Sequence, residues 1–392
     1  MNKLRQIIAD NWQPALIIGI STLFIVGLFW FKLGSLTIGP HQSELSYAAN
    51  NANLNLVANK PLNLPHAALT AVIQIFGSHS IFVLRSVSAL FGLLAVWLFY
   101  LIIRSWHTTR IAFMATALFA SSSWLLHAAR LGTPDILYTA LLSLVLFGIW
   151  LKKGKWPSIT LFGLAIIGTL LLYIPGLIWF VLPGLFWQRK RIFTTLNQMP
   201  LWLSVLWTIA VLLLVVPLLR AVWLKPEILR PLLGLPDHWP TIKQVFDNAL
   251  AIPRQLLWRG PKDPAHWLGT IPLLDVFNIT MFAVGLYAYW FSVKLDRTRL
   301  LAAVSIIGFI LVSIGGPVKL LILMPFIYII GAAGLALLLQ QWLTVFPRNP
   351  LAHTIGTGLI VITVALTSFY HISQYFIAWP NAPETKAAFI RQ

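Results

Sequence analysis

The sequence predicts an all-α, polytopic membrane protein, a bundle of about eleven membrane-spanning helices with amphipathic helices in its outer loops. Of the 392 residues, 58% are hydrophobic and only 10% are charged. The apolar residues form runs along nearly the whole chain, and a run of about 17–25 residues is long enough to cross a hydrocarbon layer of about 30 Å as a helix. The expected spans are residues 15–36, 81–103, 111–127, 135–151, 156–172, 174–187, 201–223, 271–293, 300–314, 318–341 and 351–372.

The first run is too long for a cleaved signal peptide and lacks a small-residue cleavage pattern, so we interpret it as an uncleaved signal anchor. Only residues 173–176 separate the fifth run from the sixth, which makes this helical hairpin the least distinct pair of spans. The expected parts of the chain are an amino-terminal module (1–223) with a first outer loop (39–80), a second outer loop (224–270), and carboxyl-terminal helices with an outer tail (271–392).

Basic residues cluster in every second connection between the expected spans. Cytoplasmic connections are enriched in Lys and Arg, so this alternation predicts that the amino terminus and all of these clusters lie inside. The inner basic residues are Arg104, Arg110, Lys152, Lys153, Lys155, Arg189, Lys190, Arg191, Lys294, Arg297, Arg299 and Arg348. Of the ten acids, only Asp10 and Asp296 then lie inside, and any chemistry is expected to be extracytoplasmic. The outer face also carries basic residues, which suit an anionic ligand such as a lipid phosphate, although interfacial snorkelling explains most of them taken singly.

The first outer loop opens with the sequence Pro-His-Gln-Ser-Glu at residues 40–44. Apolar residues at helical spacing follow, with asparagines on much of the other face, so we expect a short amphipathic helix on the membrane surface just after Glu44. The prolines of the sequence Lys-Pro-Leu-Asn-Leu-Pro-His at 60–66 then predict a turn before the chain re-enters the membrane.

The second outer loop is rich in proline and contains Trp239, Trp258 and Trp267. Tryptophan prefers the headgroup zone of a membrane. This composition is equally consistent with a lid over the membrane surface and with a plug that only closes the bundle.

Glu44 and Asp135 are two of very few acids, and both fall at the outer mouth of the expected bundle. An acid beside hydrocarbon is costly and is by default a functional candidate. Asp135 follows Pro134 at the start of the fourth span, where an aspartate most often only compensates the helix dipole. Glu44, on the first outer loop, is the expected partner of Asp135, and this pairing favours a functional role for Asp135.

The order of these features resembles the polyprenyl-phosphate-dependent glycosyltransferases of the GT-C fold, especially the branch of protein O-mannosyltransferases and aminoarabinose transferases. The matching segments are Ser-Glu-Leu-Ser-Tyr-Ala at 43–48, Lys-Pro-Leu at 60–62, Arg85 with the small residues after it, Ala-Arg-Leu-Gly-Thr-Pro-Asp at 129–135, and Tyr-Phe-Ile-Ala-Trp-Pro at 375–380. The similarity is good over about the first 190 residues and looser beyond them. It implies a GT-C-like bundle that transfers a sugar from a polyprenyl-phosphate donor, with inversion expected.

Two residues depart from the family pattern. Ser43 stands where the family has the first acid of an Asp-Glu pair, so only Glu44 is left for that role. Asn59 stands where metal-binding relatives have an acid before the Lys-Pro turn, and an amide oxygen is a weaker ligand for a hard cation. A divalent-cation cofactor is therefore in doubt. The chain has no cysteine, which excludes disulfides and thiolate metal sites.

The implied reaction needs a carboxylate to take the acceptor's proton and cations to stabilise the departing phosphate. Glu44 is the candidate base. Asp135 is expected to orient the acceptor, assist a cation or position an arginine. The candidate substrate-binding residues are Lys60, Arg85, Arg130 and Lys319, as the phosphate clamp, together with Tyr47 and His66. His66 and His127 are discounted as metal ligands because no acid or second histidine lies at ligand spacing.

The expected partners are a polyprenyl-phosphate sugar donor, a protein, lipid or glycan acceptor, and the lipid bilayer, with no nucleic acid. We expect a multi-pass protein of the plasma membrane with an extracytoplasmic active site. A lipid or solute transporter or flippase is the main alternative, but transporters usually carry ionisable residues near the bilayer midplane, where these spans have almost none. A catalytically degenerate accessory protein of the same fold is the third interpretation, and Ser43 keeps it open.

Overall fold

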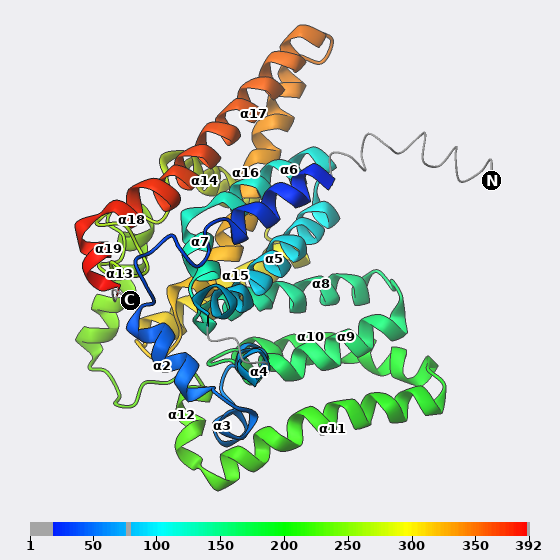
Figure 1. The fold of residues 1–392 in the computed structure, drawn as a ribbon. Helices are drawn as coiled ribbons and strands as arrows, with labels where there is room; N and C mark the ends of the chain where they lie inside the picture. The colour runs from blue at the N-terminus through cyan, green and yellow to red at the C-terminus, as the bar shows by residue number, and fades with distance from the viewer. Residues whose placement is uncertain (1–18, 76–79, 390–392) are drawn as a thin grey trace, which may run out of the picture.

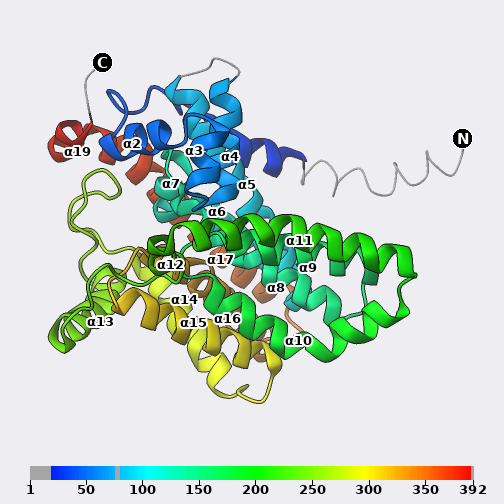
Figure 2. The same cartoon turned by 90° about the horizontal axis from the view of Figure 1, so that it is seen from below.

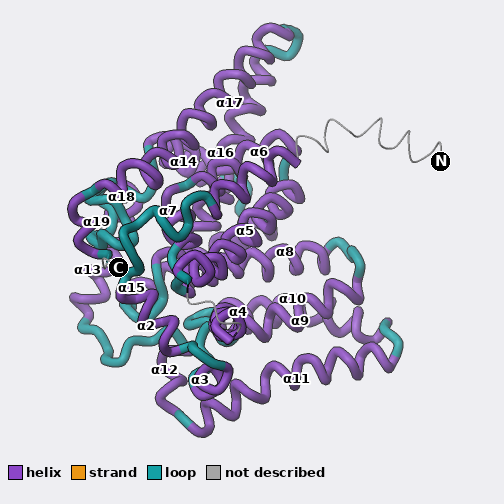
Figure 3. The backbone as a smooth tube through the Cα atoms, in the orientation of Figure 1, coloured by secondary structure: helices purple, strands orange, loops and turns teal. Residues whose placement is uncertain are grey.

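The computed structural model describes residues 19–75 and 80–389, and within these ranges the chain forms helices and no strand (Figure 3). One isolated antiparallel bridge joins His41 to Phe389. The all-α prediction is thus confirmed for the described residues.

A helix overlaps each expected span, although residues 15–18 of the first span are outside the described residues and α10 runs eleven residues beyond the expected end of the sixth span. These helices are Gly19–Trp30, α5 (Ile81–Trp106), α6 (Thr109–Ser121) with α7 (Ser123–Arg130), η1 (Pro134–Ala140) with α8 (Leu141–Lys152), α9 (Pro157–Leu171), α10 (Ile178–Gln198), α11 (Leu201–Leu224), α14 (Val276–Trp290), α15 (Asp296–Ser313), η3 (Leu320–Leu323) with α16 (Met324–Val345), and α17 (Pro350–Ser373). By length and composition, five helical stretches of the described chain could cross a membrane, or six if α6 and α7 form one span. The number of eleven spans therefore stays a prediction.

The remaining helices lie in the connections and in the segment after the last expected span, and all but α13, which has 16 residues, have at most 12. They are α2 (Gln42–Asn50), α3 (Leu54–Asn59), α4 (Leu64–Ile75), η2 (Pro226–Ile228), α12 (Leu229–Leu232), α13 (Ile242–Leu257), η4 (Gln374–Ala378), α18 (Trp379–Asn381) and α19 (Pro383–Ala388). The expected surface helix of the first outer loop is present as α2. It begins at Gln42, so Glu44 lies within its first turn instead of before it.

Two opposite ends of the molecule can be distinguished by the elements that they carry (Figures 1 and 2). One end carries α2, α12, α13 and α19, while the connections α8–α9 and α10–α11 lie at the other. Lys152 forms an ion pair with Asp296, and the Lys153 amine donates a hydrogen bond to the Ser105 carbonyl oxygen over 3.3 Å. These contacts join three connections that the sequence predicts on the inner side. We call the end with α2, α13 and α19 the outer end.

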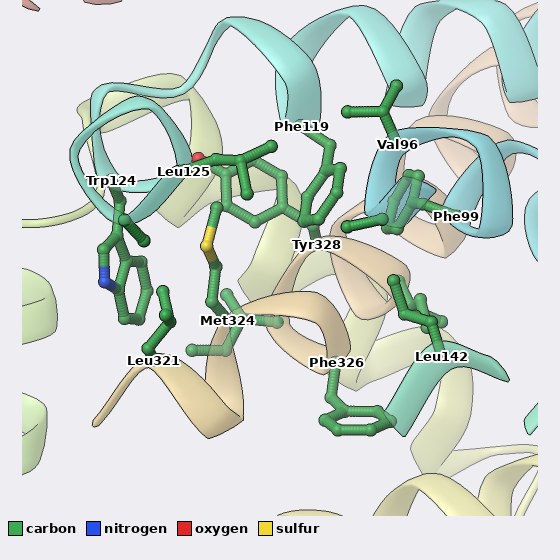
Figure 4. Packing of buried hydrophobic residues seen from close by; sticks show 14 of the residues in the cluster. Val96, Phe99, Phe119, Trp124, Leu125, Leu142, Leu321, Met324, Phe326 and Tyr328 are labelled. Atoms are coloured by element: carbon green, nitrogen blue, oxygen red, sulfur yellow. The ribbon is translucent and has the colours of Figure 1, made fainter. Parts of the chain in front are cut away.

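The core surrounds α16, of whose most apolar stretch 78% is buried, against 6% for α11 at the edge of the bundle. Figure 4 shows aromatic rings from three helices meeting there. The rings of Phe99 and Phe119 stack with centroids 4.3 Å apart, and the Tyr328 ring meets Phe119 edge-on at 5.5 Å. Such pairs add about 0.5–1.5 kcal/mol each beyond their burial.

The expected third span is broken. Helices α6 and α7 meet at an angle of 57° around Ser122. The Ser122 hydroxyl accepts a hydrogen bond from the Leu125 amide over 3.2 Å and so caps a new helix, as serine commonly does. The bend carries His127 and Arg130 to the outer end of the bundle.

Candidate functional site

Glu44 and Arg85 form a buried, two-pronged ion pair between α2 and α5. The Nε and Nη2 atoms of Arg85 each donate to one carboxylate oxygen of Glu44 over 2.8 Å, and both side chains are at most 3% exposed. The other guanidinium bonds go to Leu33, Thr37 and Gly39. Arg85 therefore ties the first outer loop to the bundle.

The Glu44 carboxylate accepts two further hydrogen bonds from backbone amides. They come from His41 over 2.8 Å and from Gly132 over 2.7 Å. The His41 bond closes a capping box at the start of α2. Burial on its own raises the pKa of Glu44, but the hydrogen bond and charge of Arg85 and the two amides outweigh it, and the pKa is lowered. Four donors on one carboxylate leave it poorly suited to take a proton from a substrate.

Arg130, at the end of α7, is 1% exposed and is also committed within the protein. It donates to the carbonyl oxygens of Leu28 over 2.5 Å and Phe31 over 2.6 Å, and to the Tyr375 hydroxyl over 3.3 Å. Its guanidinium lies 4.6 Å from the centroid of the Phe376 ring. The phosphate-clamp role expected of Arg85 and Arg130 finds no support in this geometry, because all five donors of Arg85 are engaged and each guanidinium nitrogen of the buried Arg130 already donates to a protein oxygen.

Tyr47 and His66 lie together beside the 131–135 connection. The Tyr47 hydroxyl is 3.2 Å from Nδ1 of His66, and Nε2 of His66 is 2.8 Å from the Ser88 hydroxyl. Ser88 donates to the Thr133 carbonyl oxygen over 3.1 Å. This chain of contacts brings α2, α4 and α5 to the residue that lies two positions before Asp135.

Asp135 is partly exposed at the start of η1, and its carboxylate has no hydrogen-bond partner within residues 19–75 and 80–389. Burial and then the charge of Asp135 raise the pKa of Tyr47 above its usual value. One turn later, the Tyr138 hydroxyl donates to the Pro317 carbonyl oxygen over 3.1 Å, which brings η1 to the segment before Lys319. Asp135 is thus a free acid at the outer end, unlike Glu44.

Lys60 and Lys319 are both exposed, and neither amine has a hydrogen-bond partner in the part of the chain that the structure describes. Lys319 lies directly before η3 and near η1. Lys60 lies at the end of α3, and no described hydrogen bond or ion pair links it to Asp135. Lys319 is therefore a free cation on the segment that packs against η1, the helix that carries the free acid.

His266, on the second outer loop, is a site residue that sequence reasoning missed. Its Nδ1 is 2.7 Å from a carboxylate oxygen of Asp263, and its ring lies 6.1 Å from the His41 ring. The charges of Asp135 and Lys319 both act on it. An aspartate three residues before a histidine was the available signal. We call Tyr47, Asp135, His266 and Lys319 the polar cluster; it draws on α2, η1, the second outer loop and the segment before η3.

The tail of the chain closes one side of this region. Trp379 donates from its indole to the Pro264 carbonyl oxygen over 2.9 Å and stacks on Tyr375 at 5.2 Å. His127 lies between these rings and Trp267, 2% exposed. Within the described ranges, no group of three or more His, Asp or Glu residues is arranged to hold a metal ion.

Comparisons with known proteins agree on one architecture. Residues 60–223 match the family described as dolichyl-phosphate-mannose-protein mannosyltransferase. The structure is similar to ArnT from Cupriavidus metallidurans in the apo state, with a TM-score of 0.55 and 16% identity over 97% of this chain and 77% of that one. ArnT from the same organism, bound to undecaprenyl phosphate, aligns with a TM-score of 0.52 and 15% identity over 96% of this chain and 77% of that one.

No curated protein sequence matches the chain significantly. The family match covers the first outer turn and the helices that follow it, and the shared fold extends over nearly the whole chain. The resemblance expected from the motifs is confirmed at the level of the fold: residues 60–223 match that mannosyltransferase family, and the chain is a polytopic membrane protein with the GT-C fold.

Proposed function

We propose that this protein transfers a sugar from a polyprenyl-phosphate donor to an acceptor hydroxyl at the outer end, which faces away from the cytoplasm, with inversion at the sugar carbon. The observation that carries this proposal is the free carboxylate of Asp135, whose charge acts on the same histidine, His266, as the charge of Lys319. One acid to take a proton and one cation to meet a phosphate are the minimum that this reaction needs.

The comparisons support the class of donor. The matching family is named for a dolichyl-phosphate-linked mannose, and one structure of the same fold is bound to undecaprenyl phosphate. Both are lipid-linked phosphates. A donor of this class enters from the bilayer, so its phosphate would meet the protein at the ends of the spans, where this chain carries its free charges.

Asp135 takes the base role in this proposal, and Glu44 the positioning role. Glu44 binds the amide of Gly132 and so fixes the connection that presents Asp135. The acceptor hydroxyl would pass its proton to Asp135 as its oxygen attacks the sugar carbon. The broken bond would leave its electron pair on the phosphate, next to Lys319. Tyr47 is a proposed substrate contact, and His66, which is buried, is proposed to position it through the contact between its Nδ1 and the Tyr47 hydroxyl.

The test is incubation of the purified protein with radiolabelled polyprenyl-phosphate sugars and native membranes. Asp135→Asn should lower turnover by about 10²–10⁴-fold, because the amide cannot accept the proton, with little loss of donor binding. Asp237→Asn is the matched control, since Asp237 is an exposed aspartate of the second outer loop. Normal turnover of Asp135→Asn would refute the assignment of the base.

A donor-binding accessory protein is the second candidate, and the saturation of Glu44 together with Ser43 in the family's acid position favours it. It predicts binding of undecaprenyl phosphate without transfer of any sugar. Ser43→Asp restores the family pattern beside His41, whose ring nitrogen lies 2.7 Å from the Ser43 hydroxyl. Gain of transfer in this variant alone would identify a weakened enzyme, whereas counterflow of a solute in vesicles would identify a transporter.

A further inference from the structure

His266 and Asp263 form an oriented pair on the second outer loop. The Asp263 carboxylate also accepts a hydrogen bond from the Ala265 amide over 3.1 Å, which fixes it with respect to the histidine ring. The bond between Nδ1 and Asp263 leaves Nε2 with no hydrogen-bond partner in the described chain, and the histidine side chain is 27% exposed. An imidazole held in this way by a carboxylate presents its second nitrogen to a substrate.

Charged groups from every neighbouring segment face this histidine. They are Asp263 on its own loop, Asp135 at the start of η1, Lys319 before η3, His41 at the start of α2, and His127 on α7. Two acids and one permanent cation therefore share its surroundings. The two acids favour a protonated imidazole. Because neither acid is fully buried against it, the imidazolium can still interact with an anion.

No other histidine of this region has both a free ring nitrogen and a carboxylate bound to its ring within the described residues. Both ring nitrogens of His66 are engaged by Tyr47 and Ser88, and Nδ1 of His41 caps α2 through Ser43. His127 is enclosed by aromatic rings and is 2% exposed. Arg85 and Arg130 are committed to structural partners. A phosphate that leaves its sugar in the polar cluster thus has Lys319 and His266 as available donors.

We propose that His266, oriented by Asp263, is a further catalytic residue that donates its Nε2 proton to the phosphate as the phosphate leaves the sugar. This inference rests on the proposed function. It assigns to the second outer loop a direct part in the reaction, beyond that of a cover.

Charge and protons are conserved in this step. The donor phosphate is a diester with one negative charge, and breakage of its bond to the sugar would leave a monoester with two. The imidazolium passes one proton to the leaving oxygen and becomes neutral, while Asp135 gains the proton of the acceptor hydroxyl. The cycle is completed when Asp135 and the phosphate lose their protons to water and His266 regains one. A phosphate monoester has its second pKa at about 6, so it exchanges a proton readily with an imidazole.

The protonation state supports this role. Burial lowers the pKa of His266, but the hydrogen bond and charge of Asp263, with a further contribution from Asp135, outweigh it and raise the pKa above its usual value. The acid form is therefore present below the raised pKa and is lost as the pH rises through it. Removal of the Asp263 charge should move this loss to lower pH.

The kinetic test compares pH profiles of sugar transfer. Wild-type turnover should fall on the alkaline side as His266 loses its proton. His266→Gln should lower kcat by about 10²–10⁴-fold and abolish this alkaline limb, whereas Asp263→Asn should shift it to lower pH. His238→Gln and Asp237→Asn are the matched controls, because both residues are exposed on the same loop and outside the polar cluster. An unchanged profile in His266→Gln would overturn the inference while the proposed function stands.

A binding test is independent of turnover. Undecaprenyl phosphate, the product-like probe, is titrated into the full-length protein in detergent at several pH values. Its affinity for the wild type should decrease as the pH rises through the His266 pKa, and His266→Gln should bind about 10- to 100-fold more weakly at low pH and lose this dependence. If no sugar is transferred but this dependence is found, the proposed function fails and the phosphate contact of His266 stands. Equal affinity of the wild type and His266→Gln at all pH values would refute the contact itself.

Discussion

Glu44 holds the first outer loop in place, because its carboxylate is the common acceptor of Arg85 and two backbone amides. Glu44→Gln removes the charge that compensates a buried guanidinium, and loss of one member of a buried pair costs about 3–5 kcal/mol. We expect a clear fall in melting temperature, measured in detergent. Glu227→Gln is the control, since Glu227 is exposed on the outer end. Full stability with a large loss of turnover would instead return Glu44 to the role of base.

The same carboxylate gives stability a pH dependence. The folded-state pKa of Glu44 is lowered from a usual value of 4.5, so its contribution is fully present above pH 4.5 and is lost as the pH falls through the folded pKa. The wild type should therefore lose melting temperature below pH 4.5. Glu44→Gln should show a flatter curve in this range, and parallel curves for the two proteins would contradict the assignment.

At the scale of elements, α14 and α16 touch backbone to backbone. A Cβ atom added at Gly285 would lie 1.9 Å from the Ile330 carbonyl oxygen, and one at Gly334 would lie 2.0 Å from that of Met281. Small residues allow this close approach in membrane helix pairs. Gly285→Leu must push the helices apart and should cost at least about 1–3 kcal/mol in the free energy of unfolding.

The matched control for this helix contact is Gly358→Leu on α17, where an added Cβ meets nothing within 4 Å. Both variants place the same side chain in an apolar helix. Thermal unfolding in detergent should separate them. Equal melting temperatures would mean that α14 can shift along α16 without loss of packing.

At the scale of the whole molecule, the alternation of charged connections predicts the sidedness of the protein. The contact between Lys152 and Asp296 shows two of the basic connections at one end of the bundle. The chain has no cysteine, so single cysteines can be introduced for labelling with an impermeant reagent in intact cells. Lys153→Cys should be protected and Asp237→Cys labelled, because the first lies in an inner connection and the second in an outer loop.

The cysteine-free parent protein sets the background of this labelling experiment. Outside labelling at residue 153 would reverse the predicted orientation. It would also place the polar cluster on the cytoplasmic side and so remove the proposed site from the outer face.

Several features of the fold follow from the sequence alone. Apolar runs of sufficient length must be helical in a membrane, since an unpaired backbone amide in hydrocarbon is too costly, and helices overlap all the expected spans. The family motifs around Glu44 and Asp135 predicted the segments on which the candidate site is built, and that site stays a prediction. The 57° break at Ser122 was missed because three serines in succession, at 121–123, scarcely change the hydropathy of the run. Helix α4 was missed because its twelve residues are too short for a span.

Only the packing of the helices shows which partners the buried charged side chains bind. Arg85 and Arg130 looked like phosphate ligands in the sequence, yet they donate to carbonyl oxygens between residues 28 and 39, where a helix ends and leaves its last acceptors without partners. The packing of the helices determines which arginine, distant in the sequence, reaches those carbonyl oxygens. The polar cluster also depends on packing, because residues 47, 135, 266 and 319 lie far apart in the sequence. Only the folded bundle brings them close enough to interact electrostatically. Composition and motifs are enough to predict a membrane protein that resembles a glycosyltransferase, whereas only the packed helices show which of its few charges have no partner among the described residues.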